Sequence, residues 1–173
     1  MNKGIIISGN LAQDHEFIYP YYRLLEEEID TDVCILEGTP VKGILGTTLP
    51  PNKSQIVKKI NDINVEDYDI LVLPGGVKAM EKVRQNKDII KFISNFNAMN
   101  KIIACICSGA QLLISAKVVK NRNIAGYYSM KDDLINAGAN YTDKPAVVDR
   151  NIITTAHYKD MGPWMREVIK KIK

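Results

Sequence analysis

The chain has 173 residues, and its content of 46% hydrophobic and 25% charged residues indicates a soluble globular protein rather than a disordered one. Its 23 basic and 20 acidic residues are spread along the chain and give a net charge of only +3, which does not indicate a nucleic-acid-binding protein. No segment reaches the ~18 consecutive apolar residues of a membrane span, and the apolar run near the N-terminus is too short for a signal peptide. We therefore expect one cytoplasmic domain, residues 1–173, without membrane contact.

Short runs rich in isoleucine and valine alternate along the chain with longer segments of helical periodicity. The middle runs are continuously apolar, which is typical of strands covered by helices on both faces. Strands separated by helices predict right-handed crossovers and a mostly parallel sheet between two helix layers, an α/β three-layer sandwich. The expected strands are Gly4–Ser8, Asp32–Leu36, Asp69–Leu73, Ile102–Ile106, Ala146–Asp149 and Asn151–Thr154. The last two are close enough to form a tight edge hairpin.

Two of the expected helices lie in the first hundred residues. The first spans about 14–29, and Pro20 within it indicates either a kink or a start near that proline. The second spans 88–99 and carries isoleucines and a phenylalanine on one side. Between strands, the segment 37–53 is rich in glycine, proline and threonine, so we expect a long surface excursion there.

The other helices follow the fourth strand. One starts at Ser108, and another, 131–137, ends before Gly138, a natural C-terminal residue of a helix. The last is opened by Asp160 as the expected N-cap. Its four-residue spacing predicts that one apolar stripe is buried, formed by Trp164, Val168 and Ile172.

The three cysteines are an odd number in a chain of this length, which argues against a disulfide framework. Cys34 and Cys105 lie inside apolar strand runs, so we interpret both as core residues. The chain has only two histidines and no paired CxxC motifs, so no metal site is expected.

In open α/β sheets, ligands bind beyond the carboxyl ends of the strands. Three strand ends bring unusual residues to that edge. The first strand leads into Gln13-Asp14-His15-Glu16, the third ends in Pro74-Gly75-Gly76, and the fourth ends in Cys107-Ser108-Gly109.

Cys107 stands where a strand becomes a helix within two residues. A nucleophile on such a turn is held exposed, and the helix N-terminus beside it favours negative charge, so we expect a lowered thiol pKa. The backbone N–H groups of Ser108 and of Gly75 or Gly76 are expected to converge as an oxyanion hole. From spacing alone, the alternative is that Cys107 is a small core residue and Gly75-Gly76 an ordinary turn.

Taken together, these residues resemble the PfpI/ThiJ family, which includes intracellular protease I and the Parkinson-associated deglycase. The resemblance covers nearly the whole chain in five ordered blocks. These are Glu16–Tyr21, Leu71–Gly76, Cys107–Leu113, Lys131–Gly138 and Trp164–Glu167.

The resemblance implies a flavodoxin-like fold, a homodimer that sometimes assembles further, and chemistry without a cofactor on a small-molecule substrate. Activities in the family include peptidase or amidase action, conversion of methylglyoxal to lactate, and repair of glycated groups. All of them share a thiolate that attacks an electrophilic carbon while a carboxylate handles protons. The resemblance therefore assigns Cys107 as the nucleophile.

The chain departs from the family pattern in the pocket. Gln13 stands where the family has a glutamate, and Ser108 stands where it has a histidine after the nucleophile. Asp14 or Glu16 is expected to replace the acid if the loop is shifted, and His157 to replace the base. The alternatives are that Asp14 caps the helix, that Glu16 is a first-turn acid, and that His157 is a rim residue.

The leading hypothesis is a cysteine-dependent hydrolase or hydratase, protease- or amidase-like, with Cys107 as nucleophile and Gln13 and Glu16 positioning the thiolate or the substrate. Tyr127 is expected to line the pocket. The alternatives are a glyoxalase or deglycase, and a non-enzymatic redox or stress-response homologue that oxidises at Cys107. A glutamine-amidotransferase-like domain fits less well. Its chemistry needs a His-x-Glu pair on a late strand, whereas His157 is followed by Tyr158 and Lys159.

Overall fold

The structure is a computed structural model that describes residues 2–173. Its centre is a seven-stranded sheet of order β10-β11-β7-β6-β1-β2-β5, in which only the β10–β11 pair is antiparallel. This confirms the mostly parallel α/β sheet and the edge hairpin. The strands are β1 (Lys3–Ser8), β2 (Asp30–Ile35), β5 (Val57–Lys58), β6 (Ile70–Leu73), β7 (Ile102–Ile106), β10 (Val147–Asp149) and β11 (Ile152–Thr155).

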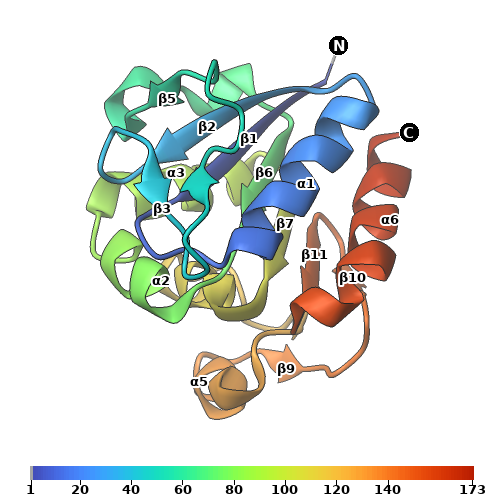
Figure 1. The fold of residues 1–173 in the computed structure, drawn as a ribbon. Coiled ribbons are helices and arrows are strands. Elements are labelled where there is room, and N and C mark those ends of the chain that lie inside the picture. The colour runs from blue at the N-terminus through green and yellow to red at the C-terminus, as the bar shows by residue number, and fades with distance from the viewer. Residues whose placement is uncertain (1) are drawn as a thin grey trace.

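Helices cover both faces of this sheet (Figure 1). Helices α1 (Asp14–Glu26) and α6 (Met161–Ile172) lie side by side on one face. Helices α2 (Val77–Val83), α3 (Lys87–Ala98) and α4 (Ala110–Ser115) pack together on the other. The central strands β1, β6 and β7 are almost wholly buried because both faces are covered, which explains their continuous apolar runs.

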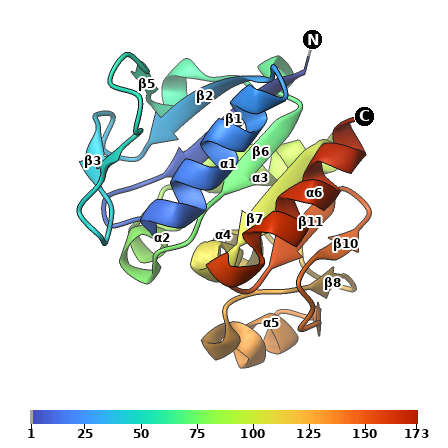
Figure 2. The same ribbon diagram turned by 45° about the vertical axis from the view of Figure 1, so that its right-hand side comes forward.

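Two small two-stranded sheets were not predicted. The strands β3 (Val41–Lys42) and β4 (Thr48–Leu49) form an antiparallel hairpin inside the segment expected to be irregular. The strands β8 (Asn123–Ile124) and β9 (Asn140–Tyr141) pair beside α5 (Lys131–Asn136), away from the chain termini (Figure 2). Strands of two residues carry no periodicity, so sequence patterns do not reveal them.

Helix α1 begins at Asp14, and Pro20 lies inside it, so a start near Pro20 is ruled out. In α6, Trp164 and Val168 are fully buried as expected, whereas Ile172 is only partly buried. Asp160 occupies the N-cap position of α6, but its side chain makes no capping hydrogen bond. The apolar stripes of the two helices nonetheless close the core from the same side.

Cys34 and Cys105 are buried in β2 and β7, and this confirms that both are core residues. Within residues 2–173, no helix has the length and apolar character needed to cross a membrane. The same residues contain no cluster of three or more His, Cys, Asp or Glu side chains that could hold a metal ion.

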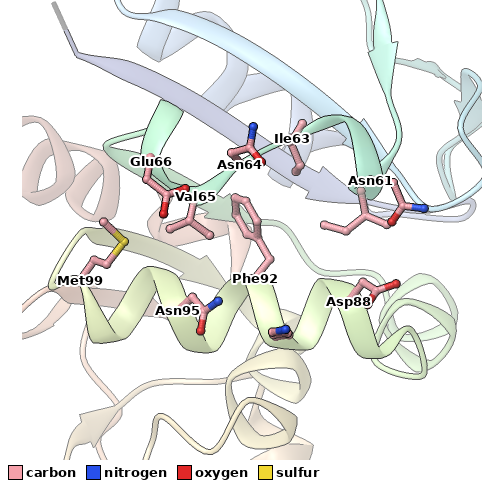
Figure 3. A pocket seen from close by; sticks show the side chains of 11 residues that line it. Asn61, Ile63, Asn64, Val65, Glu66, Asp88, Phe92, Asn95 and Met99 are labelled. Atoms are coloured by element: carbon pink, nitrogen blue, oxygen red, sulfur yellow. The ribbon is translucent and has the colours of Figure 1, made fainter.

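A polar groove of about 470 Å³ lies between α3 and the short 3-10 turns Ile60–Asp62 and Val65–Asp67. Figure 3 shows amide and charged side chains along both of its walls, with Phe92 between them. None of the residues at the ends of β1, β6 and β7 lines this groove, so it is separate from the cysteine site.

Candidate active site

The elbow at Cys107 is strained in the way a nucleophile turn requires. Strand β7 ends at Ile106, and Cys107 takes a left-handed backbone with φ +58° before a 3-10 turn leads into α4. A non-glycine residue in this region carries strain of order 1–2 kcal/mol, and such strain concentrates at functional sites. Gly109 makes the turn possible, because a Cβ there would lie 2.6 Å from the carbonyl oxygen of Leu73.

Glu16 brings a fully buried carboxyl group to this thiol. Its Oε2 accepts a hydrogen bond of 2.8 Å from the backbone N–H of Gly75. Its Oε1 is buried without a hydrogen-bond partner, and the Cys107 thiol interacts with the same carboxyl group. Gly75 fills the space between them, since a Cβ there would overlap Glu16 Oε2 and lie 2.8 Å from the Cβ of Cys107.

Both acids hold their protons more tightly than they would in water. Burial raises the pKa of Glu16 to about 7, against the lowering effect of the Gly75 N–H and the Cys107 thiol. Burial and the adjacent Glu16 charge raise the pKa of Cys107 to about 12, and the Ser108 N–H opposes this only in part. The expectation of a lowered thiol pKa is therefore wrong. Near neutral pH, Glu16 is therefore partly ionised, whereas Cys107 remains a thiol.

Gln13, rather than Asp14, caps helix α1. The Gln13 Oε1 accepts a hydrogen bond of 3.1 Å from the Glu16 backbone N–H. The Gln13 backbone N–H donates to the Gly75 carbonyl at 3.1 Å, so both backbone groups of Gly75 are tied to the start of α1. Gln13 thus holds Glu16 in place and does not replace it as an acid.

Asp14 serves a different purpose from either of the two expected for it. Its buried carboxylate accepts hydrogen bonds from the backbone N–H groups of Leu45 (2.7 Å) and Thr47 (2.9 Å). Burial alone would raise its pKa, but these donors bring it below the usual range. Asp14 is therefore committed to the loop between β3 and β4, and the expectation that it caps α1 or supplies a carboxylate to Cys107 is wrong.

The contacts of Gly75 reduce the number of backbone N–H groups that can bind an oxyanion. Because the Gly75 N–H is taken by Glu16, that donor is not available to a substrate. Gly76, with φ +103°, has a backbone N–H without a partner in the described chain. The Ser108 N–H lies at the thiol, and the Ser108 hydroxyl is buried without a partner. Gly76 and Ser108 therefore remain as the available donors.

His157 lies at the rim of the site. Its Nδ1 accepts a hydrogen bond of 3.1 Å from the Lys159 N–H and caps a short 3-10 turn, Tyr158–Asp160. Its ring stacks with Tyr127, the ring centroids being 6.3 Å apart, and the Tyr127 backbone N–H donates to the Cys107 carbonyl. Since Nδ1 is already an acceptor here, the geometry supports the rim interpretation of His157 over a general base.

Sequence reasoning missed two neighbours of this rim. The ring of Tyr128 stacks on that of His157, with centroids 6.3 Å apart. The ring centroid of Tyr158 lies 4.0 Å from that of His157 and 5.7 Å from that of His15. The signal was present as two aromatic pairs, Tyr127-Tyr128 and His157-Tyr158, in segments that follow strands. Periodicity did not reveal it, because these segments are short turns.

Comparisons with known proteins identify the family. The sequence pattern described as the DJ-1/PfpI family matches residues 2–171. The chain is 36% identical over 171 residues to the deglycase PfpI of Pyrococcus furiosus, covering 99% of both chains. It is 33% identical over 152 residues to general stress protein 18 of Bacillus subtilis, covering 87% of this chain and 86% of the relative.

A solved structure shows the same fold. It is a two-domain protein from Anabaena variabilis with DJ-1/ThiJ/PfpI-like and ferritin-like domains, similar to this chain with a TM-score of 0.91 and 25% identity. The similarity covers 99% of this chain and 48% of that one, so this chain spans about half of the two-domain protein. The fold is thus the flavodoxin-like α/β sandwich of these proteins, with a cysteine elbow at the carboxyl edge of its sheet. The chain belongs to the DJ-1/PfpI family.

Proposed function

We propose that this protein is a cofactor-independent enzyme in which Cys107 attacks the carbonyl carbon of a small substrate. Glu16 takes the thiol proton, the S–C bond forms, and the carbonyl oxygen gains negative charge that the N–H groups of Gly76 and Ser108 stabilise. In hydrolysis, Glu16 then returns the proton to the leaving group, and water releases the acyl group from sulfur. Gln13 holds Glu16, and Tyr127 and His157 line the entrance.

The observation that carries this proposal is the unpartnered Oε1 of Glu16 beside the thiol. A buried carboxyl oxygen without a hydrogen bond is unfavourable for the fold and is rarely kept for structure alone. With the pKa of Glu16 at about 7, the group can both accept and release a proton near neutral pH. The pair therefore supplies a nucleophile and a proton carrier without a histidine.

Two kinds of substrate fit this step. Amides and esters would be cleaved through an acyl-enzyme, as in a protease or amidase. The α-oxoaldehydes and the glycated groups derived from them would add their aldehyde carbon to the thiolate instead. The name of the Pyrococcus relative, a deglycase, supports testing the second kind first.

The test compares the wild-type protein with Cys107→Ala on methylglyoxal, a glycated thiol and aminopeptidase-type amides. We expect lactate formation or amide cleavage that falls at least ~10³-fold in the variant, because the covalent route is lost. Cys105→Ala, at a buried neighbouring cysteine, is the matched control and should keep most of its turnover. Equal turnover by wild type and Cys107→Ala would refute the assignment.

The protein is further proposed to be a cytoplasmic homodimer, as its family suggests. Three free thiols support a reducing compartment. An apolar groove of about 600 Å³ along α1 includes the exposed Tyr19 and Tyr22 and offers a surface for a second copy. Tyr22→Glu should convert the dimer to a monomer by light scattering, whereas Ile135→Glu, equally exposed on α5, should not. A wild-type monomer would refute the dimer.

A further inference from the structure

An apolar notch lies beside the glycine turn. Leu11, Ile44, Val77 and Lys78 line a cavity of about 310 Å³. Ile44 and Val77 are 54% and 46% exposed, so the notch presents aliphatic side chains to solvent. Lys78 is the only charged residue among these lining residues and lies next to Val77 in the chain.

Hydrogen bonds and a buried carboxylate fix the loop residues that line the notch. The Ile44 N–H donates to the Ala12 carbonyl at 2.9 Å, and the Leu11 N–H donates to the Lys42 carbonyl at 2.7 Å. The buried Asp14 carboxylate binds the two further N–H groups described above. Leu11 itself has φ +66°, a strained backbone for leucine. A buried charge and a strained residue thus hold exposed apolar side chains in one place.

The notch lies next to the glycine turn of the proposed site. Val77 follows Gly76 directly, and a Cβ on Gly76 would lie 2.7 Å from the Leu11 carbonyl oxygen. Gly75, one residue earlier, packs against Cys107. Because consecutive Cα atoms are about 3.8 Å apart, Val77 lies within about 8 Å of Gly75. An acyl chain of several carbons on Cys107 is long enough to span this distance to Val77.

We propose that this notch is a substrate subsite that binds the aliphatic chain of an acyl or aldehyde group attacked by Cys107. The inference rests on the proposed function and adds the class of substrate, namely carbonyl compounds with an unbranched aliphatic chain of several carbons. Ligand pockets of this kind combine a mainly apolar wall with a few fixed polar donors, and here the donor at the inner end is the Gly76 N–H.

Three activated esters of increasing length probe the subsite: p-nitrophenyl acetate, butanoate and hexanoate. The Cys107 thiolate attacks the ester carbonyl, the S–C bond forms, and the C–O bond breaks as p-nitrophenolate leaves with the electron pair. Nitrophenolate absorbance gives the rate, and intact mass followed by peptide mapping shows that the acyl group is on Cys107. N-acetylcysteine under the same conditions gives the intrinsic reactivity of each ester.

After correction for intrinsic reactivity, we expect the second-order rate constant of acylation to rise at least ~10-fold from acetate to hexanoate, since a fully buried methylene contributes roughly fourfold. The double variant Ile44→Ser/Val77→Ser should remove this dependence, so that the corrected rate constants for acetate and hexanoate lie within about twofold of each other. Both positions are exposed, so the fold should tolerate the changes. The matched control is Val148→Ser on β10, which has the same 46% exposure as Val77 and lies outside the notch.

The outcomes separate the two proposals. Acylation of Cys107 without dependence on chain length, or a dependence that persists in Ile44→Ser/Val77→Ser, would overturn the subsite alone. Failure of every ester, acetate included, to acylate Cys107 would overturn the proposed function and the subsite with it. A dependence lost in the double variant and kept in Val148→Ser supports the subsite.

Discussion

Two buried carboxyl groups at opposite ends of the sheet show how differently one functional group can be treated. Asp32, near the amino ends of the strands, accepts from Lys3 (3.0 Å), Lys58 (2.8 Å) and Tyr68 (2.8 Å). Burial by itself would raise its pKa, but these three donors bring it below the usual range. Glu16, at the carboxyl ends, has a single N–H donor, and its pKa is raised to about 7.

The difference lies in the partners and not in the burial. Asp32 joins β2 to β1, to β5 and to Tyr68, two residues before β6, so its charge helps to hold the sheet together. Glu16 has an oxygen without a hydrogen-bond partner, and the Gly75 N–H and the Cys107 thiol lower its pKa too little to offset burial. A buried carboxyl group with few hydrogen-bond donors contributes little to the stability of the fold, but it is well suited to moving a proton. Five substitutions test this contrast.

The largest effect is expected for Glu16→Gln. Loss of the proton carrier should lower kcat/KM by roughly 10²–10⁴-fold. The same change removes the charge that raises the pKa of Cys107, so alkylation of this thiol by iodoacetamide should become faster at pH 8. Opposite changes in turnover and alkylation, measured on one sample, would establish the role of Glu16. A parallel fall in both would instead indicate a misplaced thiol.

Glu16→Gln also makes a prediction about stability. A carboxyl group with a folded pKa of about 7, above its ordinary value, binds its proton more tightly in the folded state. Its contribution to stability is therefore full at low pH and is lost as pH rises from about 4.3 through 7. The variant should avoid this loss and be about 3 kcal/mol more stable than wild type at pH 8, with little difference at pH 4. Urea unfolding at the two pH values measures the contrast.

Gly75→Ala tests the packing between the two acids. The new methyl group would overlap Glu16 Oε2 and press on Cys107, so Glu16 must shift from the thiol. A displacement of about 1 Å lowers turnover by roughly 10²-fold. Gly162→Ala is the control, because nothing lies within 4 Å of a Cβ there and the helix should gain about 0.5–1 kcal/mol. Normal turnover in Gly75→Ala would contradict the described contact.

Asp32→Asn should weaken the fold and leave turnover unchanged. Because the folded pKa of Asp32 is lowered, its stabilising effect is present above its unfolded pKa of about 3.9 and is lost as pH falls through the folded value. The variant should lose about 2 kcal/mol at pH 7, a magnitude typical of hydrogen bonds to a charged group. Near pH 2 the difference should shrink, as thermal unfolding would show. A fall in kcat at saturating substrate would contradict a purely structural role of Asp32.

The sequence was informative where periodicity was strong. The strand Ile102–Ile106 was predicted with its observed bounds, and five other strands were placed within two residues at each end. Paired β-strands of two residues, such as Val41–Lys42, and the edge strand Val57–Lys58 went unnoticed, because they are defined by hydrogen bonds across the chain rather than by local pattern. For the same reason, composition predicts an irregular segment 37–53, although it contains the hairpin of β3 and β4.

The site was predictable in its residues but not in their roles. The elbow at Cys107 and the nearness of Glu16 and the glycine turn followed from strand ends that meet at one edge. The pKa of the Cys107 thiol could not be predicted in this way. It depends on burial and on the Glu16 carboxylate, whose raising effects outweigh the lowering effect expected from the N-terminus of the short α4. Likewise, the sequence pattern does not show that Gln13 rather than Asp14 caps α1. Asp14 instead accepts a hydrogen bond from the N–H of Leu45, thirty-one residues further along the chain.

Gln13→Ala is expected to have the smallest effect on turnover, and it tests whether the helix cap positions Glu16. Removing the N-cap acceptor should cost about 1 kcal/mol and loosen Glu16 against Gly75. Asn86→Ala is the matched control, since Asn86 caps α3 through the N–H groups of Asp88 and Ile89, away from the thiol. Both variants should lose similar stability in urea, but only Gln13→Ala should lower turnover. Equal turnover in the two would show that the cap serves the helix alone.

A second change at this position separates geometry from charge. Gln13→Glu keeps an oxygen acceptor for the Glu16 N–H, so the cap and the stability at pH 5 should be retained. The added carboxylate lies near Glu16, and like charges disfavour ionisation, so the pKa of Glu16 should rise further above 7. The acidic limb of the turnover profile should then move to higher pH. A profile that stays in place would mean that the charge at position 13 does not reach Glu16, and that only the hydrogen bond of Gln13 matters.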